Sequence, residues 1–472
     1  MKKSFRNSMA VALALCLTGC AITSPQLKPQ LPVAGTYNEA APAGAAGVAP
    51  TWWQSFGSAE LSSLVSEALA GSPDLAIATE RVRQAEAQVR VAGASLFPVL
   101  SAGADTSSRA TRSVSGASGT ATSNSTDFAL TASYEIDLWG KNRAGVKSAK
   151  SSLAASQFDR DAAQLTLISG VATSYFDVQA LRTRLDIARQ NLAAAERVLD
   201  LVSARARNGA ASRLDVSRQE ATVLSQREAL VPLEQQERQT LAALAVLLGR
   251  PPEGFAVKAQ GITDLTVPAV DPGLPAELLV RRPDLASAEA QLAASNADVA
   301  AARAALLPSI KLTGSAGLAS GALLSLASGG TTAAIDIAAS LLQPIFDGGR
   351  LRGQKAVAES RERELVETYR KVILSAFADV EKALAGTSRL GQQEQLQSDV
   401  QTRAQESLRL AEVRYRAGAD DLLTVLDAQR TLFAAQDQLA QIRQDRLEAA
   451  VSLYKALGGG WTGPTSAPAP SV

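Results

Sequence analysis

The fold of this chain can be argued from residues 413–458, which read VRYRAGADDLLTVLDAQRTLFAAQDQLAQIRQDRLEAAVSLYKALG. A short segment from Arg416 to Asp421 separates two long runs in which apolar residues recur about every 3.5 positions. That spacing is typical of helices that pack against each other as a coiled coil. After the short segment, the apolar positions are Leu422, Val425, Leu426, Leu432, Phe433, Leu439, Ile442, Leu447, Ala450, Leu453, Tyr454 and Leu457. The stretch therefore predicts an antiparallel helical hairpin.

The same hairpin pattern occurs 209 positions earlier, at residues 204–249. Matching pairs are Gly209 with Gly418, Leu214 with Leu423, Val216 with Val425, Leu230 with Leu439, and Gly249 with Gly458. Upstream of the hairpins, Pro73-Asp74-Leu75 recurs as Pro283-Asp284-Leu285. Self-similarity at a fixed offset is the signature of a repeated architecture. The chain is therefore expected to hold two structural repeats, at 73–249 and 284–457.

Two segments alternate with period two, which indicates β-hairpins at about 98–138 and about 309–344. In the first, Phe128, Leu130, Ala132, Tyr134, Ile136 and Leu138 alternate with Asp127, Ala129, Thr131, Ser133, Glu135 and Asp137. In the second, the apolar positions are Ile310, Leu312, Ala316 and Leu318, followed by Ile335, Ile337, Ala339 and Leu341. We expect the Ser/Thr/Gly-rich residues 107–125 to form a loop, which leaves strands of about ten residues.

Strands of this length can cross a bilayer at a tilt. Four strands are too few to close a barrel within one chain, because about eight are the minimum, and open sheet edges do not occur in lipid. Strands that enter a membrane would therefore require oligomerisation. A dimer would supply eight strands with a filled interior, and a trimer would supply twelve with room for a lumen. The alternative is a water-soluble pair of hairpins packed on helices.

The helical pattern divides each repeat into one long helix and two shorter ones. The long helices are expected at 142–208 and 351–417, each on the order of 100 Å in length. The shorter helices are expected at 74–96, 212–249, 284–307 and 421–457. Pro232 predicts a local kink. Residues 250–283, rich in Pro and Gly, predict an equatorial connector between the repeats, and residues 458–472 predict a flexible tail.

The N-terminus has the layout of a secretory signal peptide over residues 1–19, with basic residues before an apolar run too short to span a bilayer. Leu17-Thr18-Gly19-Cys20 resembles a bacterial lipobox, in which Cys20 becomes the acylated first residue. This predicts a diacylglycerol and a fatty acyl group on Cys20, and a lipidated N-terminal segment and waist at 20–72. A plain signal peptide with an incidental cysteine is the alternative. Residues 52–56 are either a packed aromatic anchor or an interfacial aromatic belt.

Composition argues against several classes of function. The chain has 47 basic and 46 acidic residues and no basic run interleaved with aromatics, so no nucleic-acid partner is expected. It has no histidine and two cysteines, Cys16 in the predicted signal peptide and Cys20 at the predicted acylation site. A catalytic nucleophile–base pair and a thiolate or imidazole metal site are therefore not expected. The sequence predicts neither an enzyme nor a metal cofactor.

Several motifs, in order along nearly all of the mature chain, resemble the outer-membrane factors of tripartite efflux pumps. These are the TolC/OprM-like proteins, and the resemblance is closest to their NodT-type lipoprotein branch. The motifs are YEIDLWGK at 134–141, LVRRPDL at 279–285, PIFDGGR at 344–350, LDAQRTLF at 426–433 and LYKALGGGW at 453–461.

The resemblance implies a mixed α and β membrane protein. Its trimeric, twelve-stranded outer-membrane β-barrel would take four strands from each chain and continue as a long α-helical coiled-coil barrel across the periplasm. The implied partners are outer-membrane lipid, a periplasmic adaptor (membrane-fusion) protein and an inner-membrane RND-type pump. The duct itself would be passive, because the pump supplies the energy.

The resemblance also implies roles for particular residues. In the family, an aspartate in the motif that matches residues 425–428 constricts the periplasmic entrance, so Asp427 is the first candidate for the gate. The family's second acidic residue is replaced here by Thr424, and Asp420 and Asp421 either substitute for it or cap the helix. The two turns resemble adaptor-docking tips, which assigns docking to Arg207, Gly209, Ser212, Arg416, Gly418 and Asp421. Without the resemblance, a lone aspartate on a helix is more typical of a solvated face.

Together these features predict an outer-membrane exit duct for drugs or other small toxic compounds. One alternative is the same channel serving type I protein export. An alternative from a different class is a lipid-anchored periplasmic coiled-coil scaffold whose hairpins pack on helices. Conductance in planar bilayers separates the two classes, because a scaffold gives none.

Overall fold

The computed structural model describes residues 35–39, 47–112, 120–258, 261–320 and 332–463. The predicted signal peptide, Cys20 and the tail from residue 464 onward lie outside the described residues. The chain folds as two compact units. The described part of unit 1 lies within Val82–Ser156 and Ala288–Tyr369, and that of unit 2 lies within Gln30–Arg81, Gln157–Ser287 and Arg370–Val472.

Helices dominate the described part of the chain. In chain order they are η1 (Trp52–Phe56), α2 (Ala59–Gly71), α3 (Pro73–Ala94), α4 (Lys141–Arg207), α5 (Arg213–Leu247), η2 (Ile262–Asp264), η3 (Pro275–Glu277), α6 (Leu278–Arg281), α7 (Pro283–Ala304), α8 (Arg350–Arg416) and α9 (Leu422–Ala456). The long helices α4 and α8 each have 67 residues and begin one residue before the expected positions. Within the described ranges, no helix combines the length and the apolar character needed to cross a membrane.

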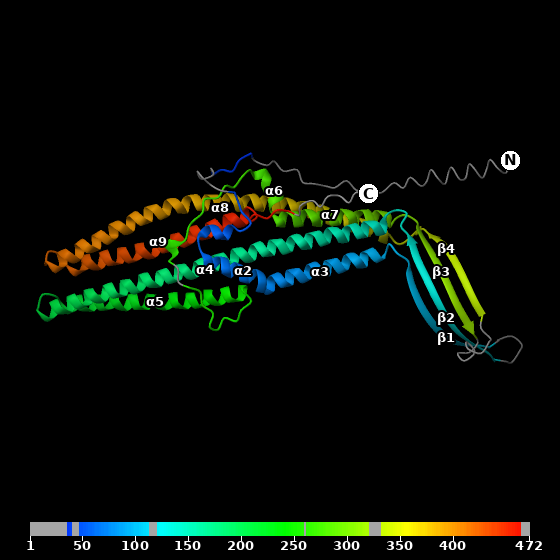
Figure 1. The fold of residues 1–472 in the computed structure, drawn as a ribbon, viewed down its shortest axis with the longest axis horizontal. Coiled ribbons are helices and arrows are strands. Elements are labelled where there is room, and N and C mark those ends of the chain that lie inside the picture. The colour runs from blue at the N-terminus through cyan, green and yellow to red at the C-terminus, as the bar shows by residue number, and fades with distance from the viewer. Residues whose placement is uncertain (1–34, 40–46, 113–119, 259–260, 321–331, 464–472) are drawn as a thin grey trace. The chain divides into compact units, whose positions relative to one another are not determined.

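Unit 1 contains one four-stranded antiparallel sheet in the order β1-β2-β3-β4 (Figure 1). The strands are β1 (Val99–Arg112), β2 (Thr120–Ile136), β3 (Ser309–Ser320) and β4 (Thr332–Leu342). Each repeat thus supplies one hairpin, and β2 and β3 join the two hairpins edge to edge. Within the described sheet, β1 and β4 each pair with one strand, so each leaves one edge without a partner.

The register of the sheet separates apolar from polar side chains. Leu130 pairs with Ala102 on one side and Ala316 on the other, and Ala316 pairs with Ile335. Because directly paired residues share a face, the apolar positions of all four strands lie on one face of the sheet. Ile335 and Ile337 on that face are 80% and 81% exposed. The opposite face carries Asp105, Asp127, Glu135, Lys311 and Asp336.

The strands of the first hairpin are longer than the sequence predicted. Residues 107–125, expected as a loop, include the last six residues of β1 and the first six of β2, and pairing continues to Arg112 opposite Thr120. The Ser107 and Ser125 hydroxyl groups are 2.9 Å apart across this extension. Serine and threonine support either a loop or a strand, and here the cross-strand hydrogen bonds favour the strand. The prediction of a loop over 107–125 was therefore wrong.

Aromatic side chains form part of the core of unit 2. Trp52 stacks on Tyr454 with ring centroids 4.9 Å apart, and Phe56 packs on Phe176 at the same distance. Trp52, Phe56 and Phe176 are buried. Of the two interpretations of residues 52–56, the packed anchor therefore fits the structure. The aromatic side chains of η1 thus pack this segment against α4 and α9.

The connector between the repeats lies along helices of unit 2. Arg182 of α4 donates a hydrogen bond to the Val257 carbonyl oxygen at 2.7 Å, and Gln179 donates to the Lys258 carbonyl oxygen at 2.9 Å. Arg443 of α9 donates to the Leu265 carbonyl oxygen at 2.6 Å. Long side chains on the helices thus satisfy backbone carbonyl groups of a segment with little regular structure of its own.

Two equivalent glycines end the last helix of each repeat. Gly249 and Gly458 have φ of 73° and 87°. A Cβ atom at Gly249 would overlap the Gly71 carbonyl oxygen, and one at Gly458 would overlap the Arg281 carbonyl oxygen. Only glycine accepts both the left-handed backbone and this close approach. The repeat seen in the sequence is therefore also a repeat of backbone packing.

Candidate functional site

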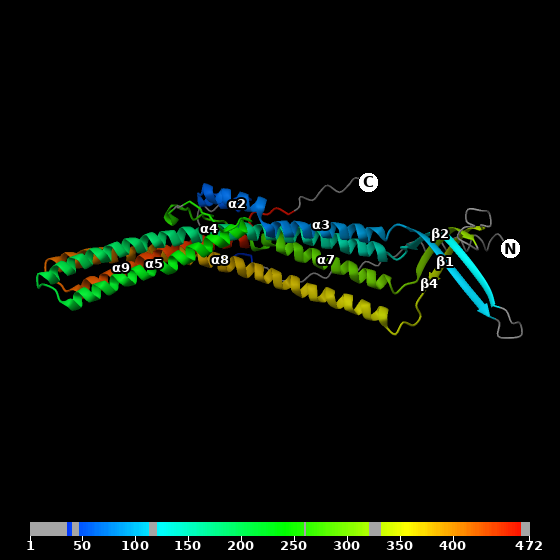
Figure 2. The ribbon, with the colours of Figure 1, turned by 90° about the horizontal axis from the view of Figure 1, so that it is seen from below.

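The two helical hairpins of unit 2 end in turns of the same design (Figure 2). In the first, Gly209 has φ of 73° and the Ala210 N–H donates to the Arg205 carbonyl oxygen at 2.8 Å. In the second, Gly418 has φ of 74° and the Ala419 N–H donates to the Arg414 carbonyl oxygen at 2.9 Å. This is the usual way in which a glycine ends a helix.

The helix after each turn begins with a side-chain cap. Ser212 and Asp215 form a reciprocal capping box, in which the Ser212 N–H and hydroxyl group donate to the carboxylate at 2.9 and 2.8 Å. These hydrogen bonds lower the pKa of Asp215. In the second turn, Asp421 accepts from the Thr424 N–H at 3.0 Å and from the Thr424 hydroxyl group at 2.9 Å. Asp421 is therefore the cap of α9.

Asp420 has a different partner. Its carboxylate accepts two hydrogen bonds from Arg414, at 2.6 and 2.9 Å, and this pairing lowers the pKa of Asp420. An aspartate that is engaged in a bidentate ion pair across its own turn stabilises that turn. Asp420 and Asp421 thus both have hydrogen-bond partners within the second turn or at the start of α9.

Asp427 lies one turn beyond Thr424, on the exposed side of α9. Its carboxylate accepts a hydrogen bond from Arg430 at 2.8 Å, and the two side chains are 66% and 83% exposed. Both line a groove of about 600 Å³ whose other wall is formed by α5 residues 221–226. The position equivalent to Asp427 in the first repeat holds Arg218. Each chain therefore offers one carboxylate at this level, and Arg430 accompanies it.

Sequence reasoning missed Arg430, although its position three residues after Asp427 on a helix was a usable signal. It also missed a contact that joins α4 to α8 near the turns. Arg205 donates to the Tyr415 carbonyl oxygen, and its guanidinium carbon lies 4.5 Å from the centre of the Tyr415 ring. Tyr415 belongs to an apolar cluster that includes Val202 of α4 and Val425 of α9. The cluster holds the two hairpins together behind their turns.

Comparison with known proteins identifies the family. The family model described as "Outer membrane efflux protein" matches residues 64–250 and 274–459, one match for each repeat. This chain belongs to the outer membrane efflux protein family. Over 466 residues it is 46% identical to the pyoverdine export outer membrane protein OpmQ of Pseudomonas aeruginosa, which covers 97% of this chain and 98% of that protein. It is 33% identical over 476 residues to the toluene efflux pump outer membrane protein TtgF of Pseudomonas putida, covering 98% of each.

Solved structures of outer-membrane channels share the fold. The outer-membrane channel OprN superposes with a TM-score of 0.87 at 27% identity, covering 94% of this chain and 100% of that chain. The open state of the Neisseria gonorrhoeae MtrE outer membrane channel gives 0.83 at 32% identity, covering 93% and 98%. The four strands, the two repeats and the long helices thus have counterparts over nearly the full length of these channels.

Membership of the outer membrane efflux protein family confirms the fold class predicted from the sequence. The chain is a mixed α and β membrane protein that supplies four strands to a trimeric barrel continued by long helices. The family consists of outer-membrane channels of Gram-negative bacteria, and the predicted outer-membrane location and channel function agree with it. The roles assigned to Asp427 and to the two turns stay predictions.

One buried amide on α9 makes no hydrogen bond within the described residues. Gln429 on α9 is fully buried, and both polar atoms of its side chain are unpaired. Gln219 on α5 is equally buried and its Oε1 is also unpaired, but its Nε2 donates to the Ala195 carbonyl oxygen at 2.8 Å. A buried polar atom without a partner costs about 1–3 kcal/mol.

Gln429→Met is therefore expected to raise the free energy of unfolding by about 1–2 kcal/mol, because an unbranched apolar side chain of similar length removes the unpaired amide. The matched variant Gln219→Met is expected to be neutral or destabilising, since it deletes the hydrogen bond to Ala195. Thermal unfolding followed by far-UV circular dichroism compares the two. Equal destabilisation by both variants would show that Gln429 is satisfied in solution.

A second prediction concerns a carboxyl pair between α4 and α9. Gln444 donates to Asp177 at 2.8 Å and to Glu448 at 2.9 Å, which holds the two acidic side chains together. Burial, followed by the contact with Asp177, raises the pKa of Glu448 to about 7. Between about pH 4.5 and pH 7 the folded chain holds a proton that the unfolded chain releases. The free energy of unfolding therefore falls as the pH rises through this window.

Glu448→Gln is expected to flatten this pH dependence and to stabilise the protein at pH 8 by about 2 kcal/mol. Thermal unfolding at pH 5 and pH 8 measures the difference. The control is Glu406→Gln, because Arg409 lowers the pKa of Glu406 and its removal does not act in the same window. If Glu448→Gln kept the pH dependence of the unmodified protein, the proton would reside elsewhere.

Proposed function

We propose that this protein is the exit duct of a tripartite efflux pump, a homotrimer that receives small molecules from a periplasmic adaptor and an inner-membrane RND-type pump. The observation that carries the proposal is the match of both repeats to outer membrane efflux proteins. The sheet supports it independently, because its apolar face suits lipid, its charged face suits water, and its two edges need partners.

The cargo proposed first is a secreted metabolite of the pyoverdine kind. OpmQ, 46% identical over nearly the whole chain, is named for pyoverdine export, whereas TtgF is named for toluene efflux at 33% identity. Drugs and other small toxic compounds form the second class to test. A passive duct selects by width and charge and does not need a tight binding site.

The test is deletion of the gene in its own host. Cells without the protein are expected to retain a normally secreted compound of the pyoverdine kind or to become sensitive to several unrelated small toxicants. Complementation with the unmodified gene should restore secretion or resistance. Unchanged secretion and unchanged susceptibility, in a strain shown to express the protein, would contradict the proposal.

The entrance is proposed to lie at the level of Thr424 and Asp427 on α9. In a trimer, three copies of Asp427 would form a ring of carboxylates, each accompanied by Arg430. Such a ring would set the ion preference of a narrow passage, and like charges would oppose complete closure. The exposure of both side chains and their place beside the groove between α5 and α9 support this assignment.

The two turns are proposed to dock the adaptor. Arg207 and Arg416 are exposed at the ends of α4 and α8, and no side chain lies within contact distance of a Cβ atom built at Gly209 or Gly418. A partner can therefore approach the backbone of each turn closely. Ser212→Cys is expected to cross-link to the adaptor, whereas the exposed Ser217→Cys one turn along α5 is expected to do so less. Equal cross-linking of the two variants would show that the turns are not the part of the chain that contacts the adaptor.

The lipid anchor is proposed at Cys20, on the strength of the lipobox that precedes it. Incorporation of labelled palmitate should be lost in Cys20→Ala. A Cys20→Ala protein that still incorporates the label would contradict this assignment.

A further inference from the structure

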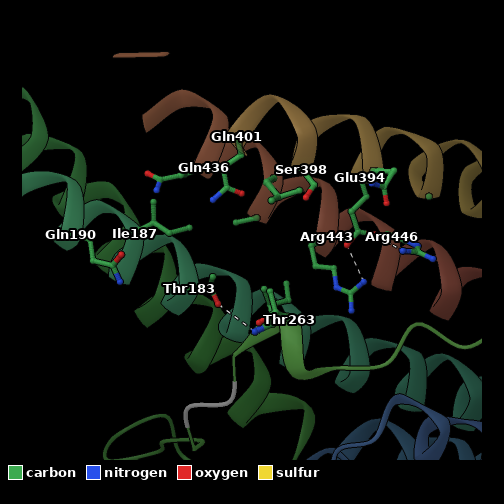
Figure 3. Close-up of a pocket in the computed structure, with 15 residues that line it drawn as sticks. Thr183, Ile187, Gln190, Thr263, Glu394, Ser398, Gln401, Gln436, Arg443 and Arg446 are labelled. Atoms are coloured by element: carbon green, nitrogen blue, oxygen red, sulfur yellow. Dashed lines mark hydrogen bonds and ion pairs between the residues drawn. The ribbon is translucent and has the colours of Figure 1, made fainter. Parts of the chain in front are cut away.

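Unit 2 contains a polar cavity of about 510 Å³ (Figure 3). Four elements line it: α4 contributes Thr183 and Gln190, and η2 of the connector contributes Ile262 and Thr263. From α8 and α9 come Glu394, Gln395, Ser398, Gln401, Gln436, Arg443 and Arg446. Its volume lies in the range of pockets that hold small molecules, which is about 300–1,000 Å³. We refer to it as the waist cavity.

The charges in the waist cavity do not cancel. Arg443 donates to Glu394 Oε1 at 3.0 Å, and Arg446 donates to the other oxygen of the same carboxylate. These three are the charged residues among those that line the cavity, so the lining carries one excess positive charge. The guanidinium group of Arg446 lies beside Gly391 of α8.

Two buried polar atoms at the cavity have no hydrogen-bond partner within the described residues. They are Nε of Arg443, a donor, and Oε1 of Gln436, an acceptor. The other nitrogens of Arg443 are engaged, one with Glu394 and one with the Leu265 carbonyl oxygen at 2.6 Å. The hydrogen bond to Leu265 holds the connector against α9, which explains one role of Arg443. It does not account for the two unpaired atoms.

The chemistry of the lining defines what would complete it. Two guanidinium groups with one excess positive charge suit a carboxylate. The side-chain amides of Gln190, Gln401 and Gln436 and the hydroxyl group of Ser398 can both donate and accept, as peptide groups require. No aromatic ring lines the cavity, so stacking on a flat ligand plays no part.

We propose that the waist cavity binds a small peptide-like molecule with one free carboxylate. The carboxylate lies beside the guanidinium groups of Arg443 and Arg446, and the amide groups of the ligand pair with the glutamine and serine side chains that line the cavity. A bound ligand would touch α4 of the first repeat and α8 and α9 of the second, and so would link the two repeats. The proposal concerns a site separate from the entrance and does not depend on the identity of the cargo.

The test uses the position of the two cysteines, Cys16 and Cys20, near the start of the sequence. Both cysteines of the sequence lie at or before residue 20, so Ser398→Cys in the acylated protein places one free thiol in the cavity. In the detergent-purified full-length protein, this thiol is expected to react with an anionic methanethiosulfonate at least about threefold faster than with a cationic one, because the local charge is positive. Ser217→Cys on exposed α5 provides the control, with no such preference.

Substitution of the arginines links this preference to the cavity. Arg446→Gln is expected to abolish the preference for the anionic reagent at Ser398→Cys and to leave the bond from Arg443 to Leu265 intact. Arg443→Gln should do the same, but it also releases the connector, so Arg446→Gln is the decisive variant. Retention of the preference in a normally assembled Arg446→Gln protein would overturn the proposed charge.

A pair of probes that differ in one group tests the ligand class. N-acetyl-diglycine at millimolar concentration is expected to slow labelling of Ser398→Cys at least twofold, whereas N-acetyl-diglycinamide, which lacks the carboxylate, should not. Three outcomes overturn the proposal: equal protection by both probes, protection by neither, or a thiol at 398 that stays unreactive while the one at 217 reacts. The last would mean that another copy of the chain fills the cavity.

Discussion

Asp427→Ala is expected to shift the ion preference of the channel in planar bilayers toward anions, by roughly three- to tenfold in the permeability ratio. In the unmodified protein each Asp427 is paired with Arg430 at 2.8 Å, so the two charges largely offset each other. Removing the carboxylate from all three chains leaves three unpaired guanidinium groups at the same level. The shorter side chain is also expected to enlarge the single-channel conductance.

The neighbouring arginine provides the opposite variant. Arg430→Gln should raise the cation preference, and the double variant Asp427→Ala with Arg430→Gln should return it to near the original value. This cycle separates the charge of the ring from its width, because the double variant restores the charge balance and keeps the shorter side chain at 427. An unaltered permeability ratio in all three variants would place Asp427 outside the conducting path.

The helical part of the fold could be predicted because its signals are local. The 3.5-residue spacing after Leu422 and the glycines at 209 and 418 depend on the helix and its own turn. The repeat then supplied a second copy of every signal, which is why α4 and α8 were placed to within one residue. The trimer was predicted from the family resemblance, because no local sequence pattern indicates the number of chains.

The ends of the first hairpin could not be predicted for a physical reason. Residues such as Ser107 and Ser125 hydrogen-bond equally well in a loop or across a strand pair, so the choice depends on the partner strand. The same holds for the site. Arg430 could have been found from its spacing to Asp427, but Arg205 and Tyr415 are 210 positions apart and come together only when both hairpins are formed. The waist cavity, assembled from four elements, is equally invisible in the sequence.

Gly458→Ala is expected to lower the free energy of unfolding by about 3 kcal/mol or more, and to reduce the amount of assembled protein in the outer membrane accordingly. Two effects add at this position. The backbone has φ of 87°, which an alanine adopts only with strain, and the new Cβ atom would overlap the Arg281 carbonyl oxygen. A backbone carbonyl cannot move aside as a flexible side chain can, so α9 would have to shift away from α6.

Two other glycines separate these effects. Gly209 has φ of 73° but open space around it, so Gly209→Ala should show the strain alone, about 1–2 kcal/mol. Gly353 lies within α8 with open space and without a positive φ, so Gly353→Ala should be neutral or stabilising by up to about 1 kcal/mol. Thermal unfolding is expected to show the largest loss of stability for Gly458→Ala, a smaller loss for Gly209→Ala and no loss for Gly353→Ala. Equal losses at 458 and 209 would show that the chain relieves the overlap with Arg281, and that the glycine at the end of each repeat is required for its backbone angle alone.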